Sequence, residues 1–380
     1  MRAPFPCWAE VDLDKLHRNA DRISETAKVP LMPVVKANAY GHGASAIARQ
    51  LSRRKDVAAL CVWSLEEALA LRKGGIKGRV ITLGGARPWE GRLAAETGAE
   101  VVVGSAEQAR ALARAAGRRA PALVHFKVNT GMNRLGSDPE DSFGQYSAIS
   151  SMKNVRLAGV MTHLASAGGS RRQTAMQLKT FADILSALRA AGKTIPPRHA
   201  ANTAAIFSHP EACLDLVRPG IGLYGIKEFP GADPGLEPVM TLRAVLIAVR
   251  SVGKGEGVSY DSMWISPGKR RVAAAAIGYA DGYSRVLSGR SHAIINGGRA
   301  PQIGAICMDT SMFDVTKVDA SAGDVATLIG PEGSGAAGAA RWAGVCGTIS
   351  YEILCRIGPR VRRIYIRRGK TQGRTGFPAF

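Results

Sequence analysis

The N-terminal 225 residues alternate short apolar runs with helical patterns, and this alternation is the strongest constraint on the fold. Each apolar run is rich in branched aliphatic residues and has the length of one buried strand. Eight such runs in sequence predict a closed parallel (β/α)8 barrel of the TIM type in preference to an open doubly wound sheet. The expected strands cover residues 29–37, 59–64, 79–85, 99–105, 122–130, 155–164, 197–203 and 216–225.

Helix signals lie between these runs. Ser64 and Ser105 each stand three residues before a Glu or Gln, which is the spacing of a capping box at a helix start. The longest expected helix covers residues 174–191, and it places one apolar face toward the barrel: Leu178, Phe181, Leu185 and Leu188.

The pattern changes after residues 230–235, where glycine, proline and aspartate form a linker-like cluster. Downstream segments of alternating polarity are bounded by turns, and Asn296-Gly297 is a hairpin signal. We therefore expect a barrel over residues 1–235 and a mostly β domain over residues 236–380. Roughly the first ten residues are candidates to pair with the β domain.

Composition favours a cytoplasmic globular protein. No secretion signal or run of membrane-spanning length is present, and six scattered cysteines favour neither a disulfide framework nor a zinc site. The net charge is +21, with 51 basic against 30 acidic residues, and residues 356–380 are strongly basic. This tail lacks interleaved aromatic residues and any nucleic-acid motif, so we expect a solvated basic surface without specific nucleic-acid binding. We also expect no membrane attachment and no metal.

A barrel brings the C-terminal ends of its strands to one mouth, where active sites of this fold lie. Polar residues at these positions should therefore converge, namely Lys36, Tyr40, Lys127, Arg134, His163, Asn202, Thr203, Arg218 and Gly220. Lys36 is the candidate reactive amine, because it follows Val34-Val35 and burial lowers the pKa of an ammonium. One standard use of such an amine is a Schiff base with pyridoxal 5'-phosphate (PLP). Taken alone, the position of Lys36 is equally consistent with a solvated lysine at a strand end.

Ordered motifs along nearly the whole chain resemble the alanine racemase family, whose PLP-dependent members pair a barrel with a C-terminal β domain. The resemblance rests on the segments that follow, which occur in the family's order. They are residues 8–12 (WAEVD), 35–43 (VKANAYGHG), 124–136 (VHFKVNTGMNRLG), 161–163 (MTH), 199–205 (HAANTAA), 217–225 (VRPGIGLYG), 278–283 (GYADGY), 307–309 (CMD) and 348–352 (TISYE).

The resemblance implies an alanine racemase that interconverts L- and D-alanine and supplies D-alanine for peptidoglycan. Lys36 would hold PLP and act as one catalytic base. Inversion at a carbon needs a second base on the opposite face, and the resemblance assigns it to Tyr260 from the partner subunit of a homodimer. Arg218 would face the pyridine nitrogen and, because a guanidinium keeps its proton, would leave that nitrogen unprotonated.

The resemblance also assigns the remaining site residues. Arg134 and the backbone of Met308 would hold the substrate carboxylate, and Lys127 matches a lysine often carried as a carbamate. His163 would lie beneath the pyridine ring and beside Arg218. The other cofactor-binding residues, several of them near the phosphate, would be Tyr40, Asn202, Thr203, Gly220, Ile221 and Tyr351.

Three positions depart from the family's usual pattern. Asn129 stands where aspartate is usual, Thr203 where serine is common, and Ala305 where many members have an entry-corridor arginine. Strictness for alanine is therefore open, and the main alternative is a broader or serine-preferring racemase of the same fold. A decarboxylase should carry an acidic residue in place of Arg218, and a non-catalytic PLP carrier should resemble the barrel alone.

Overall fold

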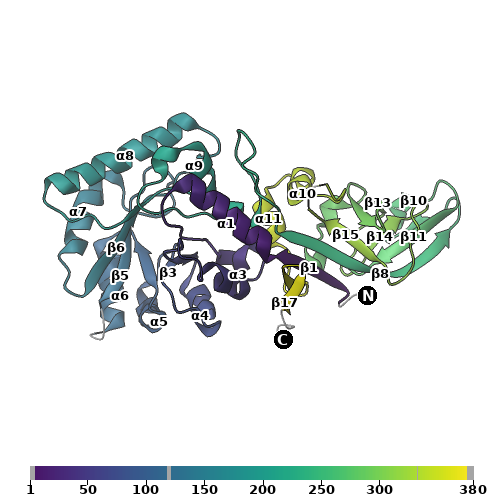
Figure 1. The fold of residues 1–380 in the computed structure, drawn as a ribbon, viewed down its shortest axis with the longest axis horizontal. Coiled ribbons are helices and arrows are strands. Elements are labelled where there is room, and N and C mark those ends of the chain that lie inside the picture. The colour runs from purple at the N-terminus through teal and green to yellow at the C-terminus, as the bar shows by residue number, and fades with distance from the viewer. Residues whose placement is uncertain (1–4, 118–120, 332, 375–380) are drawn as a thin grey trace.

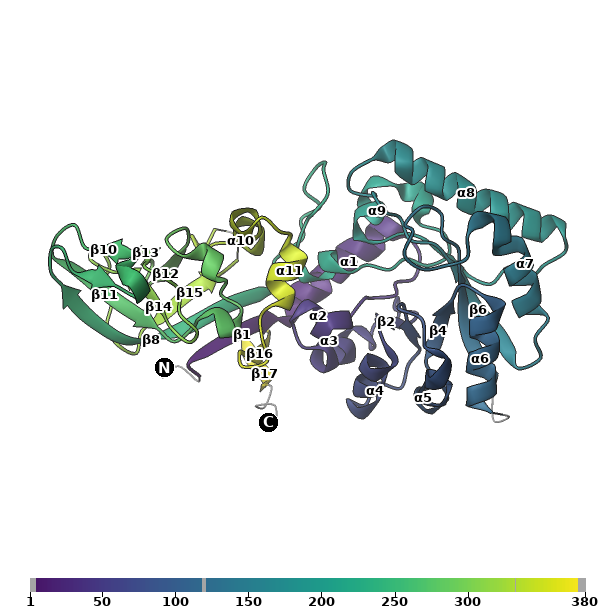
Figure 2. The ribbon, with the colours of Figure 1, turned by 180° about the vertical axis from the view of Figure 1, so that it is seen from behind.

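The computed structural model describes residues 5–117, 121–331 and 333–374. The chain forms two lobes that meet along a shared seam (Figure 1). One lobe contains the parallel strands and most of the helices, and the other is dominated by antiparallel strands, as the reverse view also shows (Figure 2). The predicted order, a barrel followed by a β domain, is confirmed.

The barrel contains a continuous parallel sheet with the order β2-β3-β4-β5-β6-β7. Residues 31–34 and 216–219 close it without forming regular strands: Met32 N donates to Val217 O at 2.7 Å, and Val35 N donates to Cys61 O at 2.8 Å. The first and last predicted strands are therefore present as isolated backbone bridges and not as regular strands. The named strands are β2 (Leu60–Val62), β3 (Val80–Thr82), β4 (Glu100–Val103), β5 (Ala122–Lys127), β6 (Val155–Met161) and β7 (Arg198–His199).

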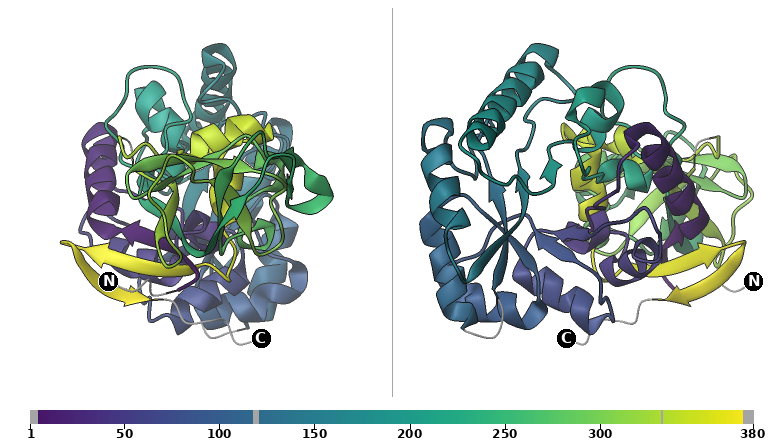
Figure 3. Two further views of the ribbon diagram at one scale, coloured as in Figure 1. Left: turned by 90° about the vertical axis from the view of Figure 1, so that its right-hand side faces the viewer. Right: turned by 60° about the vertical axis from the view of Figure 1, so that its left-hand side comes forward.

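Helices flank this sheet on its outside (Figure 3). The predicted Ser caps are present, since Ser64 Oγ accepts from Glu67 N and Ser105 Oγ accepts from Gln108 N. The helices are α1 (Leu13–Ala27), α2 (Lys36–Tyr40), α3 (Ala44–Leu51), α4 (Leu65–Lys73), α5 (Gly91–Thr97), α6 (Ala106–Ala116), α7 (Pro139–Ser150), α8 (Arg171–Ala190) and α9 (Thr203–Ser208).

The β domain is built on a nine-stranded sheet with the order β11-β14-β13-β12-β15-β8-β1-β16-β17. The long strand β8 (Met240–Val252) pairs with several neighbours, and β9 (Gly257–Val258) and β10 (Trp264–Ile265) form a separate ribbon. The other strands are β11 (Arg270–Ala275), β12 (His292–Ile295), β13 (Gly298–Ile303), β14 (Ser311–Asp314) and β15 (Val325–Ile329), and the helices are α10 (Ala339–Cys346) and α11 (Ser350–Cys355).

Both chain ends contribute to this sheet. Strand β1 (Cys7–Asp12) lies between β8 and β16 (Arg362–Arg367), and β17 (Lys370–Arg374) forms the edge. The expectation of a solvated basic tail is wrong at Arg363, whose side chain is buried and donates to four backbone carbonyls. The arginines of β16 make this strand resemble a solvated tail in the sequence. The tail residues 375–380 lie outside the described part of the chain.

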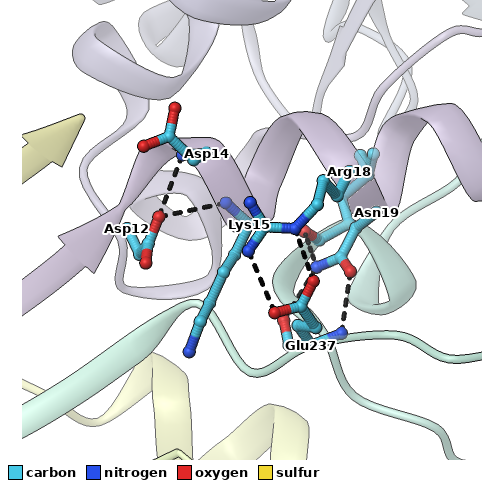
Figure 4. Close-up of polar contacts among 7 residues, drawn as sticks. Asp12, Asp14, Lys15, Arg18, Asn19 and Glu237 are labelled. Atoms are coloured by element: carbon cyan, nitrogen blue, oxygen red, sulfur yellow. Dashed lines mark hydrogen bonds and ion pairs between the residues drawn. The ribbon is translucent and has the colours of Figure 1, made fainter. Parts of the chain in front are cut away.

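Helix α1 and the segment that leads into β8 are joined by polar contacts at the seam (Figure 4). Asp12 caps α1, with its Oδ1 accepting from Asp14 N at 2.9 Å and Lys15 N at 3.0 Å. Arg18 forms a bidentate pair with Glu237, and buried Asn19 donates to Glu237 O and accepts from Glu237 N. These contacts fix the point where the chain leaves the barrel. None of the helices in the described ranges combines the length and apolarity that a bilayer crossing needs.

Candidate active site

A pocket of about 150 Å³ opens where the barrel strands end. It gathers most of the residues that the sequence placed at the mouth, from segments that are distant along the chain. The lining residues are Val34, Lys36, Tyr40, Trp63, Leu83, Lys127, Arg134, Met161, His163, Asn202, Thr203, Arg218, Gly220, Ile221 and Tyr351.

Lys36 begins a short left-handed turn. Ala37, Asn38, Ala39 and Tyr40 all have φ between 50° and 55°. Left-handed conformation costs about 1–2 kcal/mol for each such residue, so surrounding contacts must hold the turn. It ends at Gly41 with φ 84°, where a Cβ would lie 2.1 Å from Leu354 O.

Two barrel residues that the sequence does not connect with Lys36 lie against its turn. Glu67 accepts from Ala37 N through Oε1 and from Trp63 N through Oε2, both at 2.7 Å. Lys36 Nζ lies 5.3 Å from the centre of the Trp63 ring. Burial lowers the pKa of Lys36, Arg134 lowers it further, and Glu67 opposes them. The net effect is an amine that loses its proton more easily than a solvated lysine.

Arg218 is buried and its guanidinium is fixed by backbone carbonyls. Nη1 donates to His199 O at 2.8 Å, and Nη2 donates to Thr162 O at 2.8 Å and Ala200 O at 2.9 Å. His163 lies beside it, with 3.5 Å between Nη2 and Nδ1, as predicted. Nε of Arg218 has no bonded acceptor among the described residues, so this donor remains for a ligand in the pocket that Arg218 lines.

The segment after β7 and the segment at the start of η3 (Ile221–Tyr224) lie close together and are joined by hydrogen bonds. Thr203 Oγ1 accepts from Gly220 N at 3.0 Å and Gly222 N at 3.3 Å. Asn202 caps α9 by accepting from Ala205 N at 3.0 Å. A Cβ on Gly220 would lie 2.6 Å from Tyr40 Oη, so only glycine leaves room for this phenol. The resulting surface combines a hydroxyl with backbone amides, which suits an anion.

Tyr40 and Tyr351 line the pocket, and Tyr224 packs behind Tyr40 without lining it. The Tyr40 ring centre lies 5.0 Å from that of Tyr224 and 5.8 Å from that of Tyr351. Burial raises the pKa of Tyr351 to about 12, and burial also raises that of Tyr40. Both phenols therefore stay protonated at neutral pH and can donate hydrogen bonds.

The pocket has a strongly cationic lining. Lys36, Lys127, Arg134 and Arg218 line it, and its lining set contains no carboxylate. Burial, with Arg134 and Arg218 nearby, lowers the pKa of Lys127 to about 8. Such a lining favours a ligand with more than one negative group.

Tyr260 and Met308 lie on the β domain and do not line this pocket. Tyr260 is 69% exposed and Met308 is 51% exposed. The expectation that they act in the same site therefore requires a second copy of the chain to bring them there.

Comparison with known proteins identifies the family. Residues 11–228 match the family described as alanine racemase, N-terminal domain, and residues 239–365 match alanine racemase, C-terminal domain. The chain belongs to the alanine racemase family. An alanine racemase of Geobacter sulfurreducens is 41% identical over 381 residues, covering 95% of this chain and 97% of that protein. One of Halothermothrix orenii is 37% identical, with 96% and 98% covered.

Solved alanine racemases share the complete fold of this family member. The alanine racemase of Clostridium difficile 630 has a TM-score of 0.94 at 32% identity, covering 99% of this chain and 100% of that chain. The alanine racemase from Bacillus anthracis with bound L-Ala-P has a TM-score of 0.90 at 32% identity, covering 99% of both chains.

The structure shows the contacts made by two of the residues that depart from the alanine racemase pattern, Asn129 and Ala305. Asn129 Nδ2 donates to Asp138 Oδ1 at 2.8 Å and to Asn133 Oδ1 at 3.0 Å, while its Oδ1 accepts from Asn133 N at 2.9 Å. An aspartate at this position would face Asp138 without the amide donor. Ala305 is buried, and its carbonyl accepts from Ser259 Oγ next to Tyr260.

Proposed function

We propose that this chain is an alanine racemase that interconverts L- and D-alanine with PLP bound in the barrel pocket. The single observation that carries the proposal is the placement of Lys36 among Arg134, His163 and Arg218 at the barrel mouth. Family membership and this placement support the same activity. Supply of D-alanine for peptidoglycan, and a cytoplasmic location, belong to the same proposal.

The pocket residues fit PLP. The cationic lining without a carboxylate suits its phosphate, and Thr203 with Gly220, Ile221, Tyr40 and Tyr351 would hold that group. Arg218, His163 and Asn202 line the same pocket, where Arg218 would donate from Nε to the ring nitrogen and His163 and Asn202 would contact the cofactor. When bound, PLP acidifies the α-proton of an amino acid by drawing electrons into its ring. Because Arg218 does not readily give up its proton, it would donate a hydrogen bond there without protonating the nitrogen.

The chain's own residues would move the proton. Lys36 would take it from one face of the α-carbon, because burial and Arg134 favour its neutral amine. Arg134 would hold the substrate carboxylate through its planar fork, with the backbone N–H of Met308 as a second donor. Tyr260 would serve the opposite face, which requires the homodimer.

Exposed apolar side chains on the β domain support such a dimer. Those near Tyr260 in sequence are Met263, 58% exposed, and Ile265, 53% exposed. Met308 and Ile349 are also more than half exposed. Burial of this set against a second copy would carry Tyr260 and Met308 to the partner's barrel mouth. We propose with it the division into a barrel, residues 1–235, whose first strand β1 joins the other lobe's sheet, and a β domain, residues 236–380.

The test is a racemisation assay of the purified protein with a panel of L-amino acids. We expect D-alanine to form from L-alanine, and Lys36→Ala to abolish the reaction while leaving the fold intact by circular dichroism. Faster turnover of L-serine than of L-alanine would favour the alternative, a serine-preferring racemase. Equal turnover of long or basic amino acids would contradict the alanine assignment.

Lys127 is proposed to carry a carbamate. Its pKa of about 8 gives a larger neutral fraction than an ordinary lysine has, and only the neutral amine reacts with carbon dioxide. The product is an anion that would orient Arg134, a neighbour that otherwise repels Lys127. We expect a carbamate signal from the protein in ¹³C-bicarbonate that grows as pH rises through about 8 and is absent from Lys127→Arg. An equal signal in that variant would contradict the assignment.

A further inference from the structure

A line of buried hydrogen bonds leads from the pocket through the barrel interior. Arg218 Nη1 lies 2.6 Å from His199 Nδ1, and His199 Nε2 lies 2.8 Å from His125 Nδ1. His125 Nε2 lies 2.7 Å from Glu100 Oε2. Arg79 ends the line with contacts of 2.6 and 2.9 Å to the two Glu100 oxygens. Glu100 begins β4, so the line joins the mouth of the barrel to the opposite end of the sheet.

Only one arrangement of protons satisfies every contact in this line. An ionised Glu100 can only accept, so His125 must carry its proton on Nε2 and accept at Nδ1. His199 must then donate from Nε2 and accept at Nδ1. That lone pair is the acceptor for Arg218 Nη1, which can only donate. The carboxylate at one end and the guanidinium at the other therefore fix both imidazole tautomers.

The protein interior favours these charge states. Burial would raise the pKa of Glu100, but hydrogen bonds from His125 and Arg79 outweigh it and hold that pKa at about 2. Burial lowers the pKa of His125, and burial together with Arg218 lowers that of His199. At neutral pH the line therefore contains one carboxylate, two neutral imidazoles and two guanidinium groups.

The barrel backbone makes room for these side chains. His125 and His199 are both fully buried, although each brings a polar ring into an apolar core. A Cβ on Gly159 would lie 2.2 Å from His125 Nδ1, so a glycine in β6 opens the space for the ring. The register between β5 and β6 shifts between Val124 and His125, next to the same ring. The backbone of β5 and β6 is therefore shaped to accommodate the His125 ring.

We propose that Glu100 is a positioning residue which, through His125 and His199, orients Arg218 so that Nε of the guanidinium points into the pocket. The catalytic consequence rests on the proposed racemase function, whereas the proton arrangement does not. Loss of the carboxylate would leave the buried His125 Nε2–H without its protein acceptor, and the orientation of the two rings would no longer be unique.

The direct test is ¹⁵N NMR of the unmodified full-length protein labelled at histidine. We expect His125 and His199 to be neutral at pH 7, each with its proton on Nε2. His42 is the internal control, because its Nδ1 lies 3.0 Å from both Ala39 O and Tyr40 O and must carry the proton. An Nδ1–H tautomer or an imidazolium at His125 or His199 would overturn the proposal, whether or not the protein racemises alanine.

Variants at Glu100 test the consequence for the reaction. Glu100→Leu removes the acceptor, and Glu100→Gln retains one carbonyl oxygen toward His125. We expect Glu100→Leu to lower kcat by about 10- to 100-fold, with a smaller change in KM, and to disturb the tautomers of His125 and His199. Glu100→Gln should retain most of the kcat and most of the original tautomers. Asp56→Asn is the control, because it removes another carboxylate paired with arginine, Arg54, outside this line.

The outcomes separate this proposal from the proposed function. Normal tautomers and undiminished kcat in Glu100→Leu would refute a positioning role even if the unmodified protein is a racemase. A protein without racemase activity that still shows the expected tautomers would refute the proposed function and leave the proton arrangement supported. If Glu100→Leu does not fold, the spectrum of the unmodified protein still decides the arrangement.

Discussion

At the scale of single residues, the candidate site depends on side chains that position the proposed catalytic groups and alter their charge. Glu67 accepts hydrogen bonds from the backbone N–H groups of Ala37, which follows Lys36, and of Trp63, whose ring lies near the Lys36 amine. It also opposes the lowering of the Lys36 pKa that burial and Arg134 produce. One carboxylate therefore contributes to both the geometry and the charge of the candidate base.

Glu67→Ala should destabilise the protein by about 1–3 kcal/mol, because two backbone N–H groups lose a charged acceptor. Denaturant unfolding followed by circular dichroism measures this. Glu66→Ala on the same helix is the matched control, since Glu66 is exposed and forms a surface pair with Arg87; we expect it to cost less than about 1 kcal/mol. Equal costs for the two variants would show that the Lys36 turn does not need Glu67.

Much of the site could be predicted from the sequence at this scale, because barrel topology alone brings strand-end residues to one mouth. Lys36, Lys127, His163 and Arg218 all line the pocket for that reason. The sequence identifies Glu67 only as a capping-box residue of α4. Its bond to Ala37 joins segments thirty residues apart, and local spacing carries no signal for such a contact.

At the scale of elements, the left-handed turn of residues 37–40 is the feature that sequence propensity did not indicate. Four successive non-glycine residues adopt it, although alanine has no intrinsic preference for this conformation. The turn is held from the other lobe, where Arg363 Nε donates to Gly41 O at 2.8 Å and α11 packs against Gly41. Tertiary contacts from the β domain therefore shape the turn that carries Lys36.

Gly41→Ala should be strongly destabilising, because the new Cβ would meet Leu354 O. Gly75→Ala is the matched control: Gly75 has nearly the same φ, 85° against 84°, but a Cβ added there would have no neighbour within 4 Å. Gly75→Ala should cost about 1–2 kcal/mol from backbone strain alone, and Gly41→Ala about 1–3 kcal/mol more. Thermal unfolding of both variants measures the difference, and equal costs would contradict close packing of α11 on the turn.

At the scale of the whole molecule, the two lobes are interdependent. The first strand of the chain pairs with β8 and β16, so the β-domain sheet cannot be completed without the N-terminus. Periodicity predicted both lobes, but the pairing of β1 with β16 joins opposite ends of the chain. The sequence placed roughly the first ten residues beside the β domain, as β1 confirms, but it did not identify β16 as a partner strand, because the arginines of β16 resemble a surface tail.

The central claim is that Lys36 of one chain and Tyr260 of another complete one active site. Lys36→Ala and Tyr260→Phe, each inactive alone, are mixed in equal amounts under conditions that exchange subunits, and racemisation of alanine is measured. Hybrid dimers then contain one intact and one doubly altered site, so about one quarter of the unmodified activity should return. If hybrids form, as native mass spectrometry would show, and no activity returns, the shared site is contradicted.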